Sequence, residues 1–500
     1  MRVNLLTAAC VTMAWTISSA VASAAETRLI DAVKKGSRDT VRALLTTRAD
    51  VNAPETDGTT ALHWAVRADD VEMVRLLLRA GADVTKTNRY GVMPLSLAAT
   101  NGNAAMIDTL VAAGANPKSA LPEGETVLMT TARTGSVPAV RALLGYGADV
   151  KARERWQGET ALMWAAAENH GAVVKLLVEH GAEVNARSSS LQFPKIAFNG
   201  STMVSTPMPR GSLTALMMAA RQGALDGVRA LAEVGADLNL TEPEGSTALV
   251  LAILNSHPEV AVFLLERGAN PNIGDAAGMA ALYAAVEMRT PGRLINRPSR
   301  KATGEVDSLA LVKLILDRGG NPNARLKTPL LPRYHNGGDA QLTDGATPLM
   351  RAAKSIDVAA MRLLLENGAD PNLMTKSFAT PLMFVAGAGG NRNEADALEA
   401  FSLCLKFGAD INAFNNTGQT ALHIAVERSD RIVRFLVEQG AEMDLKDRDG
   451  RTPLDIAMGV SASAFQGRRG ATPTVAREST ATLLRQLMSE GAGGTRQPDR

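Results

Sequence analysis

Residues 158–187, GETALMWAAAENHGAVVKLLVEHGAEVNAR, contain the signals for two short helices. Thr160 can begin the first helix, because its hydroxyl can accept a hydrogen bond from an unpaired backbone N–H of the first turn. An alanine-rich segment follows and is interrupted near Gly171. The second helix has an apolar face made of Val173, Val174, Leu176 and Leu177. Gly181 can end it in the left-handed conformation that a residue without Cβ adopts easily. The stretch therefore predicts helix, turn, helix and a connecting loop.

The glycine phrase that ends the second helix recurs along most of the chain. Similar phrases begin at residues 81, 114, 147, 181, 235, 268, 319, 368, 408 and 440. The intervals are 33, 33, 34, 54, 33, 51, 49, 40 and 32 residues, so the longer ones are one period plus an insertion. About twelve units can be counted, and the first and last are degenerate. A unit of this size cannot bury its apolar face alone, so neighbouring units must stack.

A helix–turn–helix unit with a period of 33 residues resembles the ankyrin repeat. The family signature T-P-L-H-x-A is matched by TALHWA at residues 60–65 and by TALHIA at residues 420–425. The resemblance covers roughly residues 26–492. It implies an all-α solenoid with hairpin-like tip loops between units, and it implies protein–protein recognition as the function.

The histidines of the two signature matches, His63 and His423, occupy one structural position in different units. Elsewhere that position holds Met129, Met163, Met217, Met350, Met383, Ser96, Val250, Tyr283 and Asp455. A position that accepts methionine is a poor place for a catalytic base. The family resemblance implies that these histidines form hydrogen bonds within and between repeats, so we expect a structural role.

The first 24 residues differ from the repeats. They contain a basic Arg2, an apolar stretch from Leu5 to Ile17, and small residues at Ala22 and Ala24, which is the layout of a cleaved secretory signal. The apolar stretch is shorter than the roughly 20 residues that span a membrane. We expect export to the periplasm or secretion, a mature chain beginning near Ala25 without a membrane span, and a flexible tail at residues 493–500.

The mature chain offers little for catalysis. Its one cysteine, Cys404, aligns with a core leucine of another unit, so we expect a buried thiol. Zinc-protease, haem-attachment, nucleophile-elbow and phosphate-loop motifs are absent from the sequence, and we expect neither a metal nor a cofactor. An enzyme built from the inserted loops would have Lys195, His335 and Asp339 at its disposal. This alternative is kept as the second class of function.

Five insertions interrupt the period: residues 188–211, 290–306, 326–343, 387–393 and 459–475. We expect the first and third to extend tip loops, and the others to extend turns between the two helices of a unit. Together they carry a formal charge of +9, whereas the rest of the mature chain carries −8. Basic loops on an acidic stack can steer a partner with an anionic surface. Solvated loops alone would also explain the pattern.

Binding residues are expected at variable positions, because the repeated ones are committed to stacking. Tip loops carry aromatic residues and arginines, the side chains enriched in binding hot spots. The candidates are Tyr90, Arg153, Arg155, Trp156, Phe193, Phe198, Tyr334, Phe378 and Phe414. In the alternative interpretation, each ring packs on its neighbouring tip.

The sequence thus predicts an exported scaffold, acting as a monomer, that binds another protein along the tip edge between residues 153 and 343. A secreted effector that binds host proteins is the alternative within the same class. Nucleic acid is a poor partner, because the repeats are acidic and exposed rings are sparse. The insertion at 188–211 carries a large apolar load, so it either forms part of the binding surface or folds back over the stack.

Overall fold

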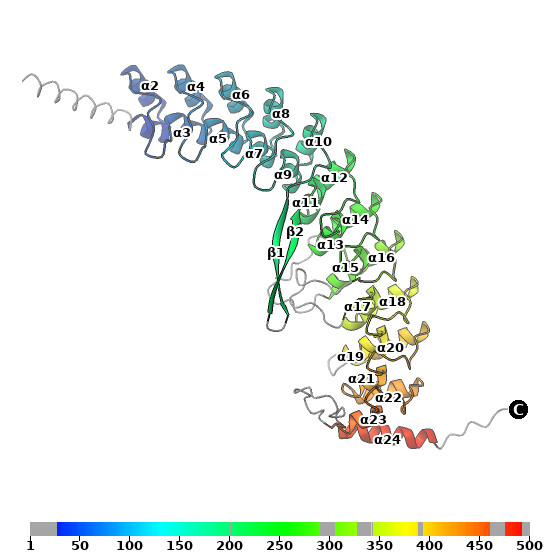
Figure 1. The fold of residues 1–500 in the computed structure, drawn as a ribbon. Helices are drawn as coiled ribbons and strands as arrows, with labels where there is room; N and C mark the ends of the chain where they lie inside the picture. Colours follow the sequence, from blue (N-terminus) through cyan, green and yellow to red (C-terminus); the bar gives the residue numbers. More distant parts are fainter. Residues whose placement is uncertain are drawn as a thin grey trace, which may run out of the picture. The chain divides into compact units, whose positions relative to one another are not determined.

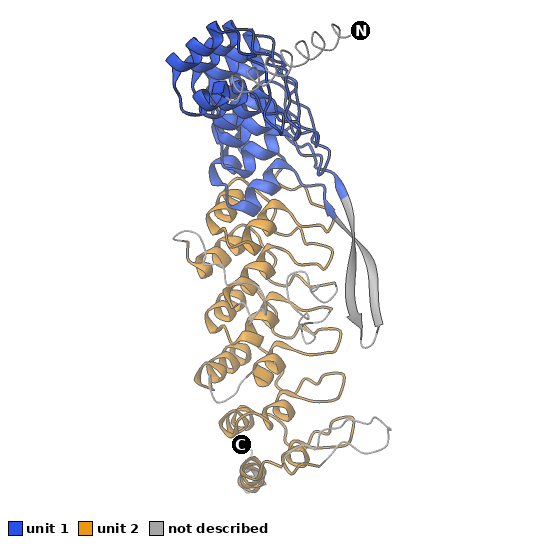
Figure 2. Cartoon of the chain, turned by 90° about the vertical axis from the view of Figure 1, so that its left-hand side faces the viewer, with its two compact units in different colours: residues 1–237 blue, residues 238–500 orange. Residues whose placement is uncertain are grey.

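The computed structural model describes residues 28–199, 202–290, 306–327, 342, 344–388, 394–460 and 476–492, with the backbone alone at 191–199, 202–209 and 491–492. The chain divides into two compact units, residues 1–237 and 238–500 (Figure 2). Each of these two compact units is a series of antiparallel helix pairs joined by loops (Figure 1).

The first unit begins with helical residues 28–34. Its further elements are α2 (Arg38–Thr46), α3 (Ala61–Arg67), α4 (Val71–Arg79), α5 (Pro94–Asn101), α6 (Ala104–Ala112), α7 (Val127–Thr134), α8 (Val137–Gly145), α9 (Ala161–Ala167), α10 (Gly171–Glu179), β1 (Ser190–Asn199), β2 (Thr202–Gly211), α11 (Ala215–Gln222) and α12 (Leu225–Glu233).

The second unit contains α13 (Ala248–Leu254), α14 (Pro258–Glu266), α15 (Ala281–Arg289), α16 (Ser308–Asp317), α17 (Pro348–Ser355), α18 (Val358–Glu366), α19 (Pro381–Ala388), α20 (Glu394–Lys406), α21 (Ala421–Ala425), α22 (Asp430–Glu438), α23 (Pro453–Ala457) and α24 (Glu478–Ala492). The described residues therefore hold twelve helix pairs, counting residues 28–34 with α2. The prediction of a helical solenoid is confirmed.

Residues 158–187 fold as their sequence predicts. Thr160 caps α9, and its hydroxyl accepts a hydrogen bond from the N–H of Met163 at 3.4 Å. Gly181 follows α10 with φ +93°. The apolar face of α10 is buried, since its four predicted residues are at most 2% exposed: Val173, Val174, Leu176 and Leu177. The core is thus a row of small apolar layers, each shared between successive helix pairs.

The short tip loops among the described residues are tight turns closed by a residue in the left-handed conformation. In the tip after α4, the N–H of Asn88 donates to Val92 O (3.0 Å), and the N–H of Gly91 donates to Asn88 O (2.9 Å). The same bond to the first tip residue is made by Gly58, Gly124, Gly245, Gly278, Gly418 and Gly450. All of these glycines have positive φ. Glycine suits this position because it lacks the Cβ that makes left-handed backbone unfavourable.

Asparagines after the helix pairs link one unit to the next. Asn52 Nδ2 donates to Gly81 O (3.0 Å), and its Oδ1 accepts from the N–H of Asp83 (2.7 Å). Equivalent bridges to the following unit start from Asn185, Asn239, Asn272, Asn323, Asn372 and Asn412. Three consecutive units instead have Thr85, Lys118 and Lys151 at this position. We call this series of contacts the asparagine bridges; it is interrupted at those three junctions.

The first insertion contains a secondary structure that the periodicity did not predict. Strands β1 and β2 pair antiparallel with Ser190 opposite Gly211 and Asn199 opposite Thr202. This register sets Pro194 opposite Pro207. Proline lacks an N–H, so an intact ladder requires this pair to be one that exchanges no hydrogen bonds.

The other four insertions lie mainly outside the described residues. Residues 291–305, 389–393 and 461–475 fall between the helices of one pair, and residues 328–341 with 343 fall between α16 and α17. The proposed signal at 1–24 and the tail at 493–500 lie outside them as well. In the described part of the chain, none of the helices has the length and apolar character needed to cross a membrane.

Candidate protein-binding surfaces

The two signature histidines complete capping boxes with the N-cap threonines of α3 and α21. His63 Nδ1 lies 2.8 Å from Thr60 Oγ1, and its Nε2 lies 3.1 Å from Val92 O of the next unit. His423 repeats both contacts, with Thr420 Oγ1 at 2.9 Å and Arg451 O at 3.2 Å. Burial is the main cause that lowers the pKa of both rings below 6.5, which keeps them neutral. The predicted bonds within and between repeats are confirmed.

Other residues at this position perform the same capping. Met129 Sδ accepts from the N–H of Thr126 at 3.4 Å, and Asp455 Oδ2 accepts from the N–H of Thr452 at 2.9 Å. A ring nitrogen, a thioether and a carboxylate therefore all accept from the same backbone donor. This explains how histidine, methionine and aspartate can replace one another at the position.

The other candidates for chemistry are Cys404 and the metal-ligating residue types. Cys404 is fully buried in α20, and burial raises the pKa of its thiol to about 12. A thiol with this pKa is not a nucleophile at neutral pH. Within the described residues, His, Cys, Asp and Glu form no cluster suited to a metal ion. Of the residues named for the enzyme alternative, His335, Asp339 and the side chain of Lys195 lie outside the described part.

The loop of residues 153–158, which we call the Trp156 tip, is held by one buried carboxylate. Glu154 accepts hydrogen bonds from the N–H of Trp156 (2.5 Å), of Gln157 (2.7 Å) and of Glu159 (2.8 Å). These bonds fix the backbone of a five-residue turn, one residue longer than its neighbours. The Trp156 side chain is nonetheless 76% exposed. A rigid loop therefore presents the largest apolar side chain to solvent.

The two arginines of the Trp156 tip bind backbone carbonyl groups. Arg153 Nη1 donates to Gly158 O (2.9 Å) and Arg187 O (2.6 Å). Arg155 Nη1 donates to Pro122 O at 3.2 Å, and its own N–H donates to Glu123 O at 2.8 Å. Both side chains thus connect the tip to its neighbours, and they add positive charge beside the indole.

The hairpin β1–β2 is anchored directly on this tip. The N–H of Ser189 donates to Gln157 O (2.5 Å), and that of Ser188 donates to Leu213 O (2.9 Å). The N–H of Ser212 donates to Ser189 O at 3.0 Å. Phe193 and Phe198 lie in β1 opposite Met208 and Met203, and their side chains are outside the described part. The base of the hairpin is therefore a continuation of the Trp156 tip.

The remaining candidate residues are spread over several tips. Tyr90, Phe378 and Phe414 are 61%, 53% and 66% exposed. The Arg89 guanidinium lies 5.1 Å from the Tyr90 ring centroid, so this ring is partly covered by its neighbour. Tyr334 lies outside the described residues, as does the predicted continuation of the surface over 328–341.

Trp64 and Trp164, on the first helices of their pairs, were not among the sequence candidates. Trp164 Nε1 donates to Glu159 Oε2 at 2.8 Å, and Arg133 lies 5.2 Å from its ring centroid. Burial is the main cause that raises the pKa of Glu159. Both tryptophans stand four positions after the capping threonine, and this shared position could have marked them as candidates in the sequence.

The second unit contains a cavity that sequence reasoning did not find. Its volume is about 530 Å³, and it lies among α17, α19, α21 and the tips that precede α19 and α21. It is lined by Lys354, Ser377, Ala379, Met383, Phe384, Gly387, Ala388, Asn415, Ile424 and Arg428. We call it the α19 hollow. Gly387 stands seven positions after the capping threonine, where other units have the long side chains of Arg67, Arg133, Arg221 and Lys354 but also Ala167 and Gly459. Gly387 lines the hollow without a side chain.

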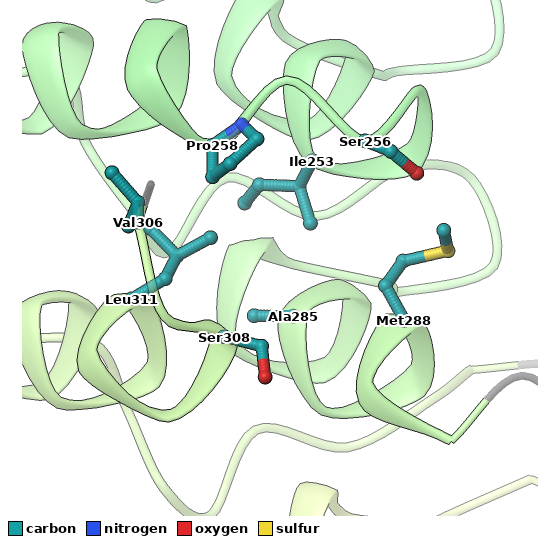
Figure 3. Close-up of a pocket in the computed structure, with 8 residues that line it drawn as sticks. All are labelled: Ile253, Ser256, Pro258, Ala285, Met288, Val306, Ser308 and Leu311. Atoms are coloured by element: carbon teal, nitrogen blue, oxygen red, sulfur yellow. The ribbon is translucent and has the colours of Figure 1, made fainter. Parts of the chain in front are cut away.

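A smaller cavity of about 70 Å³ lies among α13, α14, α15 and α16 (Figure 3). Its lining is mostly apolar, and Ile253, Pro258 and Leu311 point into it. It is well below the roughly 150 Å³ that holds a benzene molecule. We interpret it as a packing gap at a helix junction.

Comparison with known proteins agrees with this architecture. The family description "Ankyrin repeats (3 copies)" matches residues 12–88, 95–188, 200–292 and 391–463, and "Ankyrin repeat" matches residues 344–373. One similar protein is the E3 ubiquitin-protein ligase KEG of Arabidopsis thaliana, 26% identical over 269 residues. That match covers 47% of this chain and 15% of the ligase.

Two further relatives share about 30% identity with parts of the chain. SH3 and multiple ankyrin repeat domains protein 2 of Homo sapiens matches over 191 residues, which are 29% of this chain and 10% of that protein. The B-cell lymphoma 3 protein homolog of Mus musculus matches over 213 residues, 42% of this chain and 39% of its own length. The chain thus spans less than half the length of these relatives.

Ankyrin repeats mediate binding to other proteins, and the family is generally non-catalytic. The helix pairs, the threonine caps, the left-handed tip residues and the family matches over more than half of the residues lead to one conclusion. The chain belongs to the ankyrin-repeat family.

Proposed function

We propose that the mature chain is an exported, non-catalytic scaffold that binds another protein through a surface centred on the Trp156 tip. One observation carries the proposal: an indole that is 76% exposed stands on a loop whose backbone is fixed by Glu154. A partner that covers the indole would bury a large apolar surface, and a rigid loop loses little entropy on binding. Tryptophan and arginine are also the side chains most enriched in binding hot spots.

Export is supported by residues 1–24, whose basic, apolar and small-residue segments have the order of a cleaved signal. The periplasm is the proposed location, and secretion to act on host proteins is the alternative. Cell fractionation separates the two, since retention in the periplasm would exclude the effector. N-terminal sequencing of the exported protein should begin near Ala25, whereas an intact Met1 would contradict export.

The absence of catalysis is supported by the capping role of His63 and His423 and by the buried thiol of Cys404. The partner we propose has an anionic surface, because the insertions have a net positive charge whereas the rest of the mature chain has a net negative charge. The scaffold acts as a monomer in this proposal, and nucleic acid is not its ligand.

The test is a pull-down from periplasmic extract with the mature chain as bait. Replacing Trp156 by alanine should reduce recovery of the captured partner about tenfold or more, the effect of removing one hot-spot side chain. The melting temperature should stay nearly unchanged, because the indole is mostly exposed. Tyr146→Ala is the matched control, since Tyr146 is 44% exposed but ends α8 instead of lying in a tip.

A second variant examines the hairpin. Residues 190–209 are replaced by a short Gly-Ser linker that keeps the anchoring residues Ser188, Ser189 and Ser212. Loss of the partner with an unchanged melting temperature would place the hairpin in the binding surface. A large drop in melting temperature with the partner still bound would show that the hairpin covers the stack. Full recovery of the partner by both Trp156→Ala and this variant would refute the proposed surface.

A further inference from the structure

Phe378 occupies a position that glycine holds in the other short tips. Its N–H donates to Thr375 O at 2.9 Å, which is the bond made by Gly91, Gly418 and their counterparts. Its φ is +60°, in the left-handed region. Left-handed backbone is unfavourable for residues with a Cβ, and a bulky side chain there is an outlier.

The position is also crowded by the next tip. A Cβ added at Gly418 would lie 2.8 Å from the N of Arg448, and one at Gly58 would lie 3.0 Å from Cα of Asn88. Phe378 nevertheless keeps the usual bond between tips, in which the N–H of Asn416 donates to Ser377 O at 2.9 Å. The ring is 53% exposed, so burial compensates only part of this strain. Strain of this kind is concentrated at functional positions.

The two chain neighbours of Phe378 line the α19 hollow. Ser377 and Ala379 form its tip side, and Met383 and Phe384 form its floor with less than 8% exposure each. Ile424 of α21 completes the apolar wall. A volume of about 530 Å³ lies within the range of about 300–1,000 Å³ typical of ligand pockets.

The charge at the rim has one sign. Lys354 of α17 and Arg428, which follows α21, are the charged residues of the lining, and the lining contains neither Asp nor Glu. Glu427 precedes Arg428 but is exposed and does not line the hollow. Lys354 and the nearby Lys376 already have interactions within the chain, that of Lys376 being with Asp344 at 3.4 Å, so the expected charge complementarity rests on Arg428. A ligand that places a carboxylate beside an apolar group would complement this rim.

We propose that the α19 hollow, together with the exposed ring of Phe378, binds a segment of a partner protein that inserts one large apolar side chain flanked by an acidic residue. The apolar side chain fills the space beside Gly387, and the carboxylate pairs with Arg428. The proposal rests on protein binding as the function of the chain. It concerns a different surface from the Trp156 tip, so either can fail without the other.

The test selects twelve-residue peptides from a random phage-displayed library on the immobilised mature chain. Enriched peptides should carry Leu, Phe, Ile or Met next to Asp or Glu. Gly387→Leu should weaken their binding at least tenfold by filling the hollow, and a Cβ at this position meets Ile424 Cγ2 at an ordinary 3.8 Å. Ala167→Leu is the matched control, because Ala167 of α9 stands at the same distance from its capping threonine as Gly387.

Substitutions at Phe378 separate binding from strain. Phe378→Ala and Phe378→Gly should both weaken peptide binding at least tenfold. Phe378→Gly should melt ~2 °C or more above Phe378→Ala, because only glycine removes the left-handed strain. A structural role for the ring would instead leave binding intact in the folded variants. Arg428→Glu should abolish the preference for acidic residues.

Several outcomes would overturn the proposal. These are failure to enrich any peptide, enrichment without the apolar–acidic pattern, or unchanged binding by Gly387→Leu and Phe378→Gly. Equal loss in Ala167→Leu and Gly387→Leu would assign the effect to general destabilisation and count against the hollow. Binding that appears only after residues 389–393 are replaced by Gly-Ser would show that the chain itself occupies the site. Binding of the captured partner at the Trp156 tip is measured separately, so it does not affect these outcomes.

Discussion

Lys151→Asn should stabilise the junction between α8 and α10 by completing an interrupted series of contacts. At the equivalent position, Asn372 donates to Gly408 O and accepts from the N–H of Asp410, both at 2.8 Å. The matching groups beyond Lys151 are Gly181 O and the N–H of Glu183. In the described structure, the N–H of Glu183 has no hydrogen-bond acceptor within the protein. An asparagine here can therefore add two hydrogen bonds without displacing any.

The magnitude follows from the two hydrogen bonds that form and the one ion pair that breaks. Each hydrogen bond adds about 1 kcal/mol. The contact of Lys151 Nζ with Glu183 Oε1 at 3.7 Å is removed, but both side chains are more than 60% exposed. Such a pair contributes about 0–1 kcal/mol. The expected net stabilisation is about 1–2 kcal/mol, a factor of roughly 5–30 in the local opening equilibrium.

Hydrogen exchange of the mature chain, followed by mass spectrometry, measures this stabilisation. Peptides covering α9, α10 and residues 181–187 should exchange about 5- to 30-fold more slowly in the variant. Asn372→Lys is the reverse control and should speed exchange around residues 408–412 by a similar factor. If Asn372→Lys has no effect, the asparagine bridges contribute nothing and the reasoning is refuted. If Asn372→Lys speeds exchange but Lys151→Asn does not slow it, the two junctions are not equivalent.

Two further predictions concern the buried side chains of His63, His423 and Cys404. Since burial lowers the pKa of His63 and His423, the unfolded chain binds more protons between that lowered pKa and 6.5. Their contribution to stability is therefore complete above pH 6.5 and is lost as the pH falls below it. When both histidines are changed to methionine, the melting temperature should fall less between pH 8 and pH 5 than it does in the unchanged protein. At pH 8 the two melting temperatures should be nearly equal. Cys404 should react with a maleimide only after denaturation, and rapid labelling of the folded protein would contradict its burial and its pKa of about 12.

Features that recur could be predicted, because each copy confirms the others. The capping role of Thr160, the left-handed Gly181 and the structural position of His63 all follow from comparing units. The strands β1 and β2 could not be predicted in this way, since the insertion they form has no second copy in the chain. Their pairing depends on contacts within the insertion and on anchoring to the Trp156 tip.

The α19 hollow was missed for a different reason. Its signals are Gly387, at a position where several units have a long side chain, and Phe378 in place of glycine. Both were available in the sequence, but each alone is one variable position among many. Only the fold shows that they adjoin one space, because Ser377 and Ala379 line the same cavity as Gly387.

The interrupted asparagine bridges also bear on how the molecule would respond to mechanical force. Because each repeat contacts only its neighbours, tension applied along the stack passes through every junction in series. Junctions in series carry the same load, so the first to yield is the one with the fewest bonds across it. Thr85, Lys118 and Lys151 mark three junctions in succession that lack the asparagine bonds. Under pulling, extension should begin between residues 81 and 183, while the junctions bridged by Asn272, Asn323 and Asn372 hold to higher force.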